Sequence, residues 1–151
     1  MLFRSHAMSL HEAAAQARER YAIFVNGATD AVDTGQLAPT ALAAHRQAAV
    51  EIDQLVELGA PEPAALAELS RELRATHAAL RRNASLPTLL QLRQPISEAR
   101  VRIDRLYAER ERQVDAAVET SIQGTERTRE IVLALSCILA ILTVEIGRAH
   151  V

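Results

Sequence analysis

The sequence contains no tryptophan, no lysine and only one cysteine, and aromatic residues make up 3% of it. Because Cys137 has no second cysteine to pair with, an intrachain disulfide is excluded. The scarcity of aromatic residues and glycine, together with abundant alanine and leucine, favours helices that pack through small side chains. A chain of 151 residues, 49% of them hydrophobic, can fill one domain, and we expect an all-α fold.

A strong excess of charge of one sign is also missing. All 17 residues counted as lysine or arginine are arginine, and they face 19 acidic residues for a formal net charge of −2. This near balance gives no electrostatic steering toward nucleic acid or acidic lipid. We therefore expect no nucleic-acid partner.

Sequence motifs for catalysis and cofactor binding are absent as well. There is no glycine-rich phosphate loop, nucleophile elbow, paired-cysteine motif or metalloprotease helix motif. His6, His11, His45 and His77 are not spaced for two ligands on one helix face, as a haem or metal site in a bundle would favour. We expect no enzymatic activity, no cofactor and no metal, and histidines that are exposed or locally satisfied.

The two ends of the chain resemble translated adapter DNA from short-read sequencing libraries. Residues 1–5 match one adapter strand and residues 146–151 match its complement. We expect both segments to be artefacts, as an expression scar would be. We therefore expect the remaining residues to be an internal fragment of a longer protein, from which a transmembrane helix before His6 has been lost.

Four amphipathic segments follow one another, at residues 8–32, 39–58, 62–82 and 96–130. Gly35 and the stretch from Gly59 to Pro63 supply short turns. The predicted seam of the first segment contains Leu10, Ala14, Ala17, Tyr21, Phe24, Ala28 and Ala31. Such helices bury their stripes against one another, which predicts an antiparallel up-down four-helix bundle over residues 6–130.

The last of these helices is the longest. Because Pro95 disfavours helical geometry at Gln94, we expect the helix to begin near Ile96, after a short helical stretch at 88–93. Its predicted stripe is Ile96, Ile103, Tyr107, Arg110, Val114, Ala117 and Ser121. Gly124 is either a hinge or a tolerated small residue.

This helix runs into an uncharged segment. The apolar run is Ile131 to Val144, which at about 1.5 Å per residue covers roughly 21 Å of a hydrocarbon core of roughly 30 Å. We predict that residues 131–145 begin a truncated second transmembrane helix. Its representative apolar residues are Ile131, Leu135, Leu139 and Val144.

The pattern of residues 93–107, followed by residues 111–117 and a membrane entry, resembles the ligand-binding domain of bacterial methyl-accepting chemotaxis proteins. The resemblance implies a homodimer in the bacterial inner membrane, a periplasmic sensor domain and an unknown small-molecule ligand. It also implies a cytoplasmic signalling rod, of which this sequence contains nothing. The same kind of bundle precedes histidine kinases and diguanylate cyclases, and a structural membrane-tethered bundle without a ligand is a further alternative.

Arg110 is the first candidate ligand-binding residue, because it lies on an apolar stripe where an unpaired guanidinium must find an anion. Asp53 and Glu19 fall at a similar height and are candidate partners within the chain. The alternative partner is a ligand carboxylate at a helix or dimer seam.

Three other residues are candidates. His45 and Thr76 interrupt apolar seams nearer the end that would lie farthest from the membrane, and each is either structural or part of a ligand site. Arg100, with Arg102 and Arg105, either forms a solvated face with neighbouring acidic residues or lines an anion pocket at a dimer interface.

Overall fold

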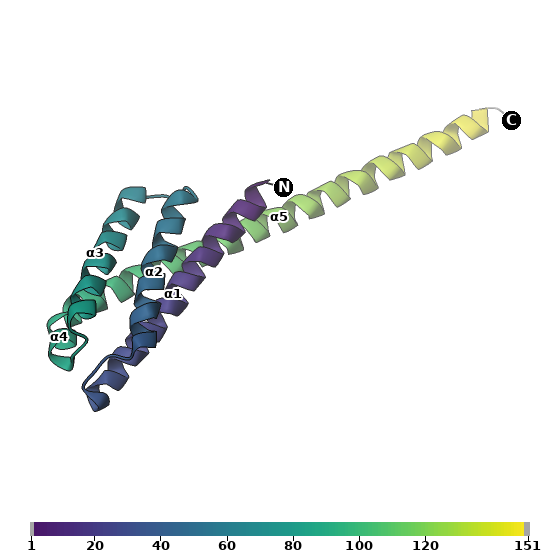
Figure 1. Ribbon diagram of the computed structural model, residues 1–151. Helices are drawn as coiled ribbons and strands as arrows, with labels where there is room; N and C mark the ends of the chain where they lie inside the picture. The colour runs from purple at the N-terminus through teal and green to yellow at the C-terminus, as the bar shows by residue number, and fades with distance from the viewer. Residues whose placement is uncertain (1, 150–151) are drawn as a thin grey trace. The chain divides into compact units, whose positions relative to one another are not determined.

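The computed structural model describes residues 2–149, and it describes the side chains of residues 10–138 (Figure 1). Every regular element in this part of the chain is a helix, so the all-α prediction is confirmed. The helices are α1 (Leu2–Thr34), α2 (Pro39–Glu57), α3 (Pro63–Arg82), α4 (Leu86–Gln91) and α5 (Arg93–Ala149). The chain divides into two compact units that meet between Val114 and Asp115, and each is described separately.

Glycine and proline set the ends of the first three helices. Gly35 follows α1 and Gly59 follows α2, both with φ of 76°, a conformation that glycine adopts without steric penalty. Pro39 and Pro63 open α2 and α3, where the fixed φ of proline suits the first turn. The predicted bounds of the second and third helices are therefore confirmed to within one residue.

The predicted start of the last helix is wrong. Helix α5 begins at Arg93, so Gln94 is helical although Pro95 follows it. Pro95 lies in the first turn, where a helix has no N–H bond to lose. The N–H of Ile96 donates to the carbonyl of Leu92 over 3.0 Å, which continues the chain of bonds past the proline.

In the first unit, α1 and α2 lie side by side (Figure 1). The ring of His45 on α2 lies 4.4 Å from that of Phe24 on α1, measured between centroids. Gly27 faces Ala41 so closely that a Cβ added to the glycine would lie 2.4 Å from the alanine Cβ. The two helices therefore approach each other through small residues.

The first part of α5 packs between α1 and α3. The Tyr21 hydroxyl donates to the carbonyl of Ile96 over 2.9 Å, and Arg18 pairs with Asp104 at 3.0 Å. Residue numbers rise along α5 as they fall along α1, so the two helices are antiparallel.

On its other side, α5 contacts α3 through an ion pair of 2.5 Å between Arg102 and Glu72. Helix α3 in turn meets α2 where Asp53 accepts hydrogen bonds from Ser70, over 2.6 Å, and from Arg74. The contacts thus connect α1, α2, α3 and the first part of α5 in a ring.

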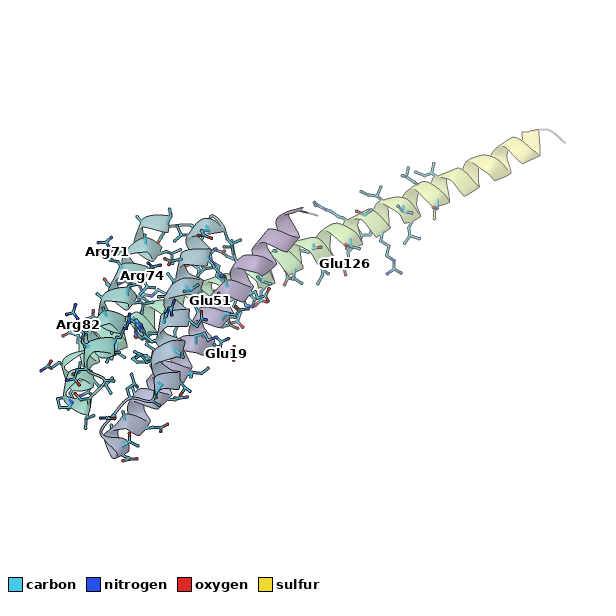
Figure 2. The ribbon with its side chains drawn as sticks, in the orientation of Figure 1. Glu19, Glu51, Arg71, Arg74, Arg82 and Glu126 are labelled. Carbon is cyan, nitrogen blue, oxygen red and sulfur yellow. The ribbon has the colours of Figure 1, made fainter. Side chains whose placement is uncertain are left out.

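One hydrophobic core joins these helices. Its largest fully buried apolar side chains are Tyr21, Phe24, Ile52, Leu55, Leu73, Leu80 and Ile103. Much of the remaining core is alanine, which keeps the helices close together. Charged side chains such as those of Glu19, Arg71 and Arg82 project from the outer surfaces (Figure 2).

The two connections at one end of this unit hold each other through backbone hydrogen bonds. The N–H of Leu37 donates to the carbonyl of Ala84 over 2.8 Å, and that of Leu86 donates to the carbonyl of Gly35 over 3.0 Å. These bonds satisfy groups that the helix ends leave free.

The second unit consists of the remainder of α5, which is helical through Gly124. Ala117 and Ser121, which were expected on the buried stripe, are exposed. Ile131 and Leu135 are 59% and 61% exposed, whereas the side chains of Leu139 and Val144 lie outside the described residues. None of the helices, over the residues that the structure describes, has a stretch with the length and apolar character needed to cross a membrane.

Candidate functional site

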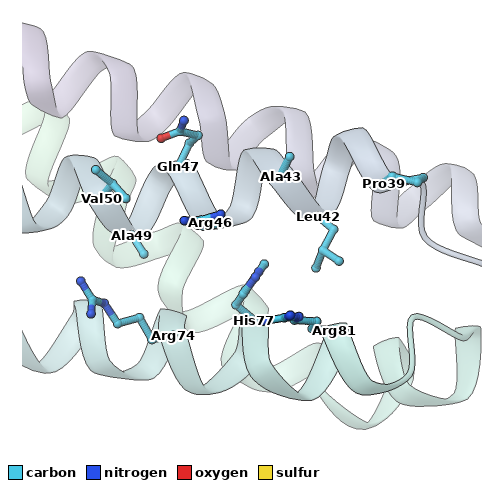
Figure 3. Close-up of a pocket in the computed structure, with 10 residues that line it drawn as sticks. All are labelled: Pro39, Leu42, Ala43, Arg46, Gln47, Ala49, Val50, Arg74, His77 and Arg81. Atoms are coloured by element: carbon cyan, nitrogen blue, oxygen red, sulfur yellow. The ribbon is translucent and has the colours of Figure 1, made fainter.

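An open groove with a volume of about 870 Å³ lies between α2 and α3 (Figure 3). Apolar residues of α2 form much of its lining, with Pro39 at one end, Leu42 and Ala49 along it and Val50 beyond. Leu42 points from α2 toward α3, and His77 points from α3 into the space between the two helices (Figure 3). The groove therefore combines an apolar wall with a titratable ring.

Three arginines line the same groove, and its lining contains no acidic residue. Arg74 is paired with Asp53, which lies outside the lining. Arg46 of α2 and Arg81 of α3 are exposed, and neither makes an ion pair or side-chain hydrogen bond with any described residue. Two cationic groups are thus available to an incoming anion.

His45 lies behind the groove and is fully buried. Its ring stacks on that of His77, with 5.9 Å between centroids and 14° between planes, and its other neighbours are Tyr21 and Phe24. Neither ring nitrogen of His45 has a hydrogen-bond partner, and Nδ1 of His77 is also buried without one. The expectation of an exposed or satisfied histidine is therefore wrong at position 45.

Burial sets the protonation of this cluster. It lowers the pKa of His45 to about 4, with a smaller effect from the nearby His77. Burial also lowers the pKa of His77, and the positive charges of Arg46 and Arg81 lower it further. Both imidazoles are therefore neutral near pH 7, and His77 is neutral partly because two guanidinium groups lie close to it.

Thr76 precedes His77 on α3 and is 8% exposed. It is buried, as its place on the seam predicts, but it is not among the residues that line the groove. The structure therefore places Thr76 beside the candidate site rather than in it.

Arg110 lies in a different place, beside a cavity of about 230 Å³ between α3 and α5. It is 5% exposed, its Nη1 donates to Gln113 over 2.7 Å, and its Nε has no partner. The predicted pairing with Asp53 is wrong, because Asp53 faces α3 and accepts hydrogen bonds from Ser70 and Arg74. No acidic side chain among residues 10–138 forms an ion pair with Arg110, Glu19 included.

Arg100 lies on the exposed surface of α5. Its Nε is 3.9 Å from Asp104, four residues along the helix, as the solvated-face interpretation predicts. Arg102 instead reaches Glu72 on α3. Arg100 lines a cavity of about 330 Å³ between α1 and α5, with Tyr107 nearby, but it does not approach the α2–α3 groove.

In the described part of the chain, no three His, Cys, Asp or Glu side chains lie close enough together to hold a metal ion. Comparison of the chain with protein-family models, with curated proteins and with solved structures gave no match.

The sequence interpretation singled out His45 but missed Arg46 and Arg81. A signal for the groove does exist, because an antiparallel helix pair brings together residues that are equally far from its turn. His45 and His77 are both sixteen residues from Pro61, in the turn between α2 and α3. Counting outward from this turn would have paired the two histidines, with Arg46 one residue from His45 and Arg81 one helical turn beyond His77.

Proposed function

We propose that this chain is the sensory module of a membrane-anchored receptor of the kind found in bacterial chemotaxis. A small molecule binds the helical bundle, and the resulting displacement of α5 passes the signal toward the membrane. The observation that carries the proposal is the continuity of α5, which includes core residue Ile103, passes through Gly124 and contains the apolar run from Ile131. The module acts without catalysis of its own.

The apolar run supports the membrane part of the proposal. Residues 131–138 are all exposed, so their apolar side chains lack a covering in the chain alone. Contiguous exposed apolar surface of this kind marks contact with lipid or with another protein. We assign residues 131–145 to the start of a transmembrane helix, with the bundle on the periplasmic side of a bacterial inner membrane and the receptor acting as a homodimer.

The stiffness of a helix supports the signalling mechanism. Backbone hydrogen bonds repeat along the axis, so a shift of about 1–2 Å at one end of a continuous helix is passed to the other. A break in the helix would absorb such a shift, and α5 has none at Gly124. A sensor half of a histidine kinase or diguanylate cyclase would use the same movement, so these outputs remain within the proposal.

A structural bundle without a ligand is the rival from another class. It is tested by thermal unfolding of the 151-residue chain in mild detergent, with and without members of a small-molecule panel. A ligand at about a hundred times its dissociation constant adds about 2.7 kcal/mol to the free energy of unfolding. We expect at least one compound to raise the melting temperature by several degrees, and a panel without any stabilising compound would favour the structural bundle.

A further inference from the structure

The α2–α3 groove has features of a site for one chemical class of ligand, and this inference rests on the proposed sensory function. Its lining combines apolar side chains, among them Leu42 and Val50, with the guanidinium groups of Arg46 and Arg81. Arg46, His77 and Arg81 line the same groove, and the positive charges of the two arginines lower the pKa of the His77 ring. An apolar body with a single acidic group would match this arrangement.

We infer that the groove binds a small organic monocarboxylate, aromatic or branched aliphatic, whose carboxylate lies between Arg46 and Arg81 and against the ring of His77. The guanidinium groups supply charge-assisted hydrogen bonds to the carboxylate oxygens. The apolar body of the ligand lies along Leu42, Ala49 and Val50, which line the same groove.

A second copy of the chain fits the groove less well than a small anion. In a symmetric dimer centred on the groove the same surface meets itself, so a lining with three arginines and no acidic residue would face its own copy. Like charges brought together in an interface oppose association. An anion instead supplies the acidic partner that the lining of the groove lacks.

Binding of an anion should change the pKa of His77. The charged and titratable groups facing this ring are His45 and Arg46 from α2 and Arg74 and Arg81 from α3. A bound carboxylate offsets the positive charges that lower the pKa of His77, so that pKa rises in the complex. The complex therefore takes up protons over the range between the two pKa values, and the affinity increases as the pH falls through that range.

The test uses calorimetry on the full chain in mild detergent with benzoate and with benzamide, which has nearly the same shape and no charge. We expect benzoate to bind at least about tenfold more tightly than benzamide, the fold-change that corresponds to a charge-assisted hydrogen bond of ordinary strength. The imidazole proton signals of His77, followed by NMR between about pH 7.5 and pH 6, should show a higher pKa when benzoate is bound.

A matched pair of double variants tests the location of the site. R46Q/R81Q removes the two groove arginines, and R71Q/R82Q removes the same charge from exposed positions of α3 outside the groove lining (Figure 2). We expect the first pair to weaken benzoate binding at least about tenfold and the second to change it less than about twofold. Equal losses in both pairs would show a general charge effect and overturn the inference.

Two other outcomes overturn the inference while leaving the sensory function testable on its own. If benzamide binds as tightly as benzoate, or if only uncharged members of the panel stabilise the chain, the sensor proposal stands and the carboxylate site fails. If neither benzoate nor any other monocarboxylate of the panel binds at millimolar concentration, the carboxylate site again fails. Only the absence of stabilisation by every compound of any class counts against both proposals.

Discussion

His45 and Arg110 are polar residues buried at different points of the first unit, and neither has a full set of hydrogen-bond partners. Buried polar atoms without partners lower stability, by roughly 1–3 kcal/mol for a neutral group and more for a charge. Aromatic rings lie beside His45, and Arg110 lines a cavity together with Leu66, Leu69 and Leu106. We therefore make a separate stability prediction for each residue.

For His45 the prediction concerns pH. Burial lowers its pKa to about 4, below the value near 6.5 expected in the unfolded chain, so the unfolded state binds more protons between those values. Stability is full above about pH 6.5 and falls as the pH drops toward 4, by on the order of 3 kcal/mol from this group. In His45→Leu, urea unfolding between about pH 7 and pH 4 should show a flatter pH dependence.

Leu80→Ala provides the control for His45→Leu, because Leu80 is also fully buried but does not titrate. It should lower stability by about 2–5 kcal/mol at every pH and leave the pH dependence unchanged. A pH dependence in His45→Leu equal to that of the original chain would contradict the assignment to His45.

For Arg110 the prediction concerns charge. Arg110→Met keeps much of the side-chain volume and removes a buried guanidinium that makes no ion pair with the described acidic residues. Replacing buried charge by a packed apolar side chain is often neutral or stabilising by about 1–4 kcal/mol. We expect the melting temperature to rise or stay constant, and a loss of about 3 kcal/mol or more would indicate a charged partner for Arg110.

At the residue scale, the sequence predicts which positions face the core but not what they meet there. Apolar periodicity places His45, Thr76 and Arg110 on buried seams, and all three are buried. The partner of Asp53 was missed, because pairing across helices depends on register and rotation that a single helix does not encode. The stacking of His45 on His77 depends on the same register and rotation, so it was not predicted either.

At the scale of elements, two glycines within helices test the packing of α1 against α2. A Cβ at Gly27 would lie 2.4 Å from the Ala41 Cβ, whereas a Cβ at Gly124 would meet no heavy atom within 4 Å. Gly27→Ala should therefore push the two helices apart and lower stability, by about 1–3 kcal/mol. Gly124→Ala should instead stabilise the helix, by about 1 kcal/mol.

The two alanine variants form a matched pair, since both make the same chemical change within a helix. Thermal unfolding, followed by circular dichroism, should show a lower melting temperature for Gly27→Ala and not for Gly124→Ala. Equal effects in the two variants would contradict the close approach at Gly27.

Elements were predicted well where turn residues mark them. Gly59 and the prolines that open α2 and α3 gave bounds for these two helices that hold to within a residue, whereas α1 ends two residues later than predicted. Pro95 was misleading, because a proline near a helix start marks the first turn and not always the first residue. The stripe of α5 was also extended too far, since Ala117 and Ser121 are exposed.

For the molecule as a whole, we propose that ligand binding in the bundle changes the position of the far part of α5. Cys137 is the one cysteine of the chain and is exposed within the apolar run, so it accepts a spin label without any substitution. The proposed homodimer would place two such labels in one assembly, and the distance between them would then report on α5.

The most direct measurement is therefore the distance between spin labels on Cys137, for the full chain in lipid nanodiscs. It is recorded with and without the compound that most raises the melting temperature. We expect a defined distance that shifts by about 1–2 Å, or a distance distribution that changes in width, when the compound is saturating. An absent dipolar signal would contradict the homodimer, and an unchanged distance at saturation would contradict signalling through α5.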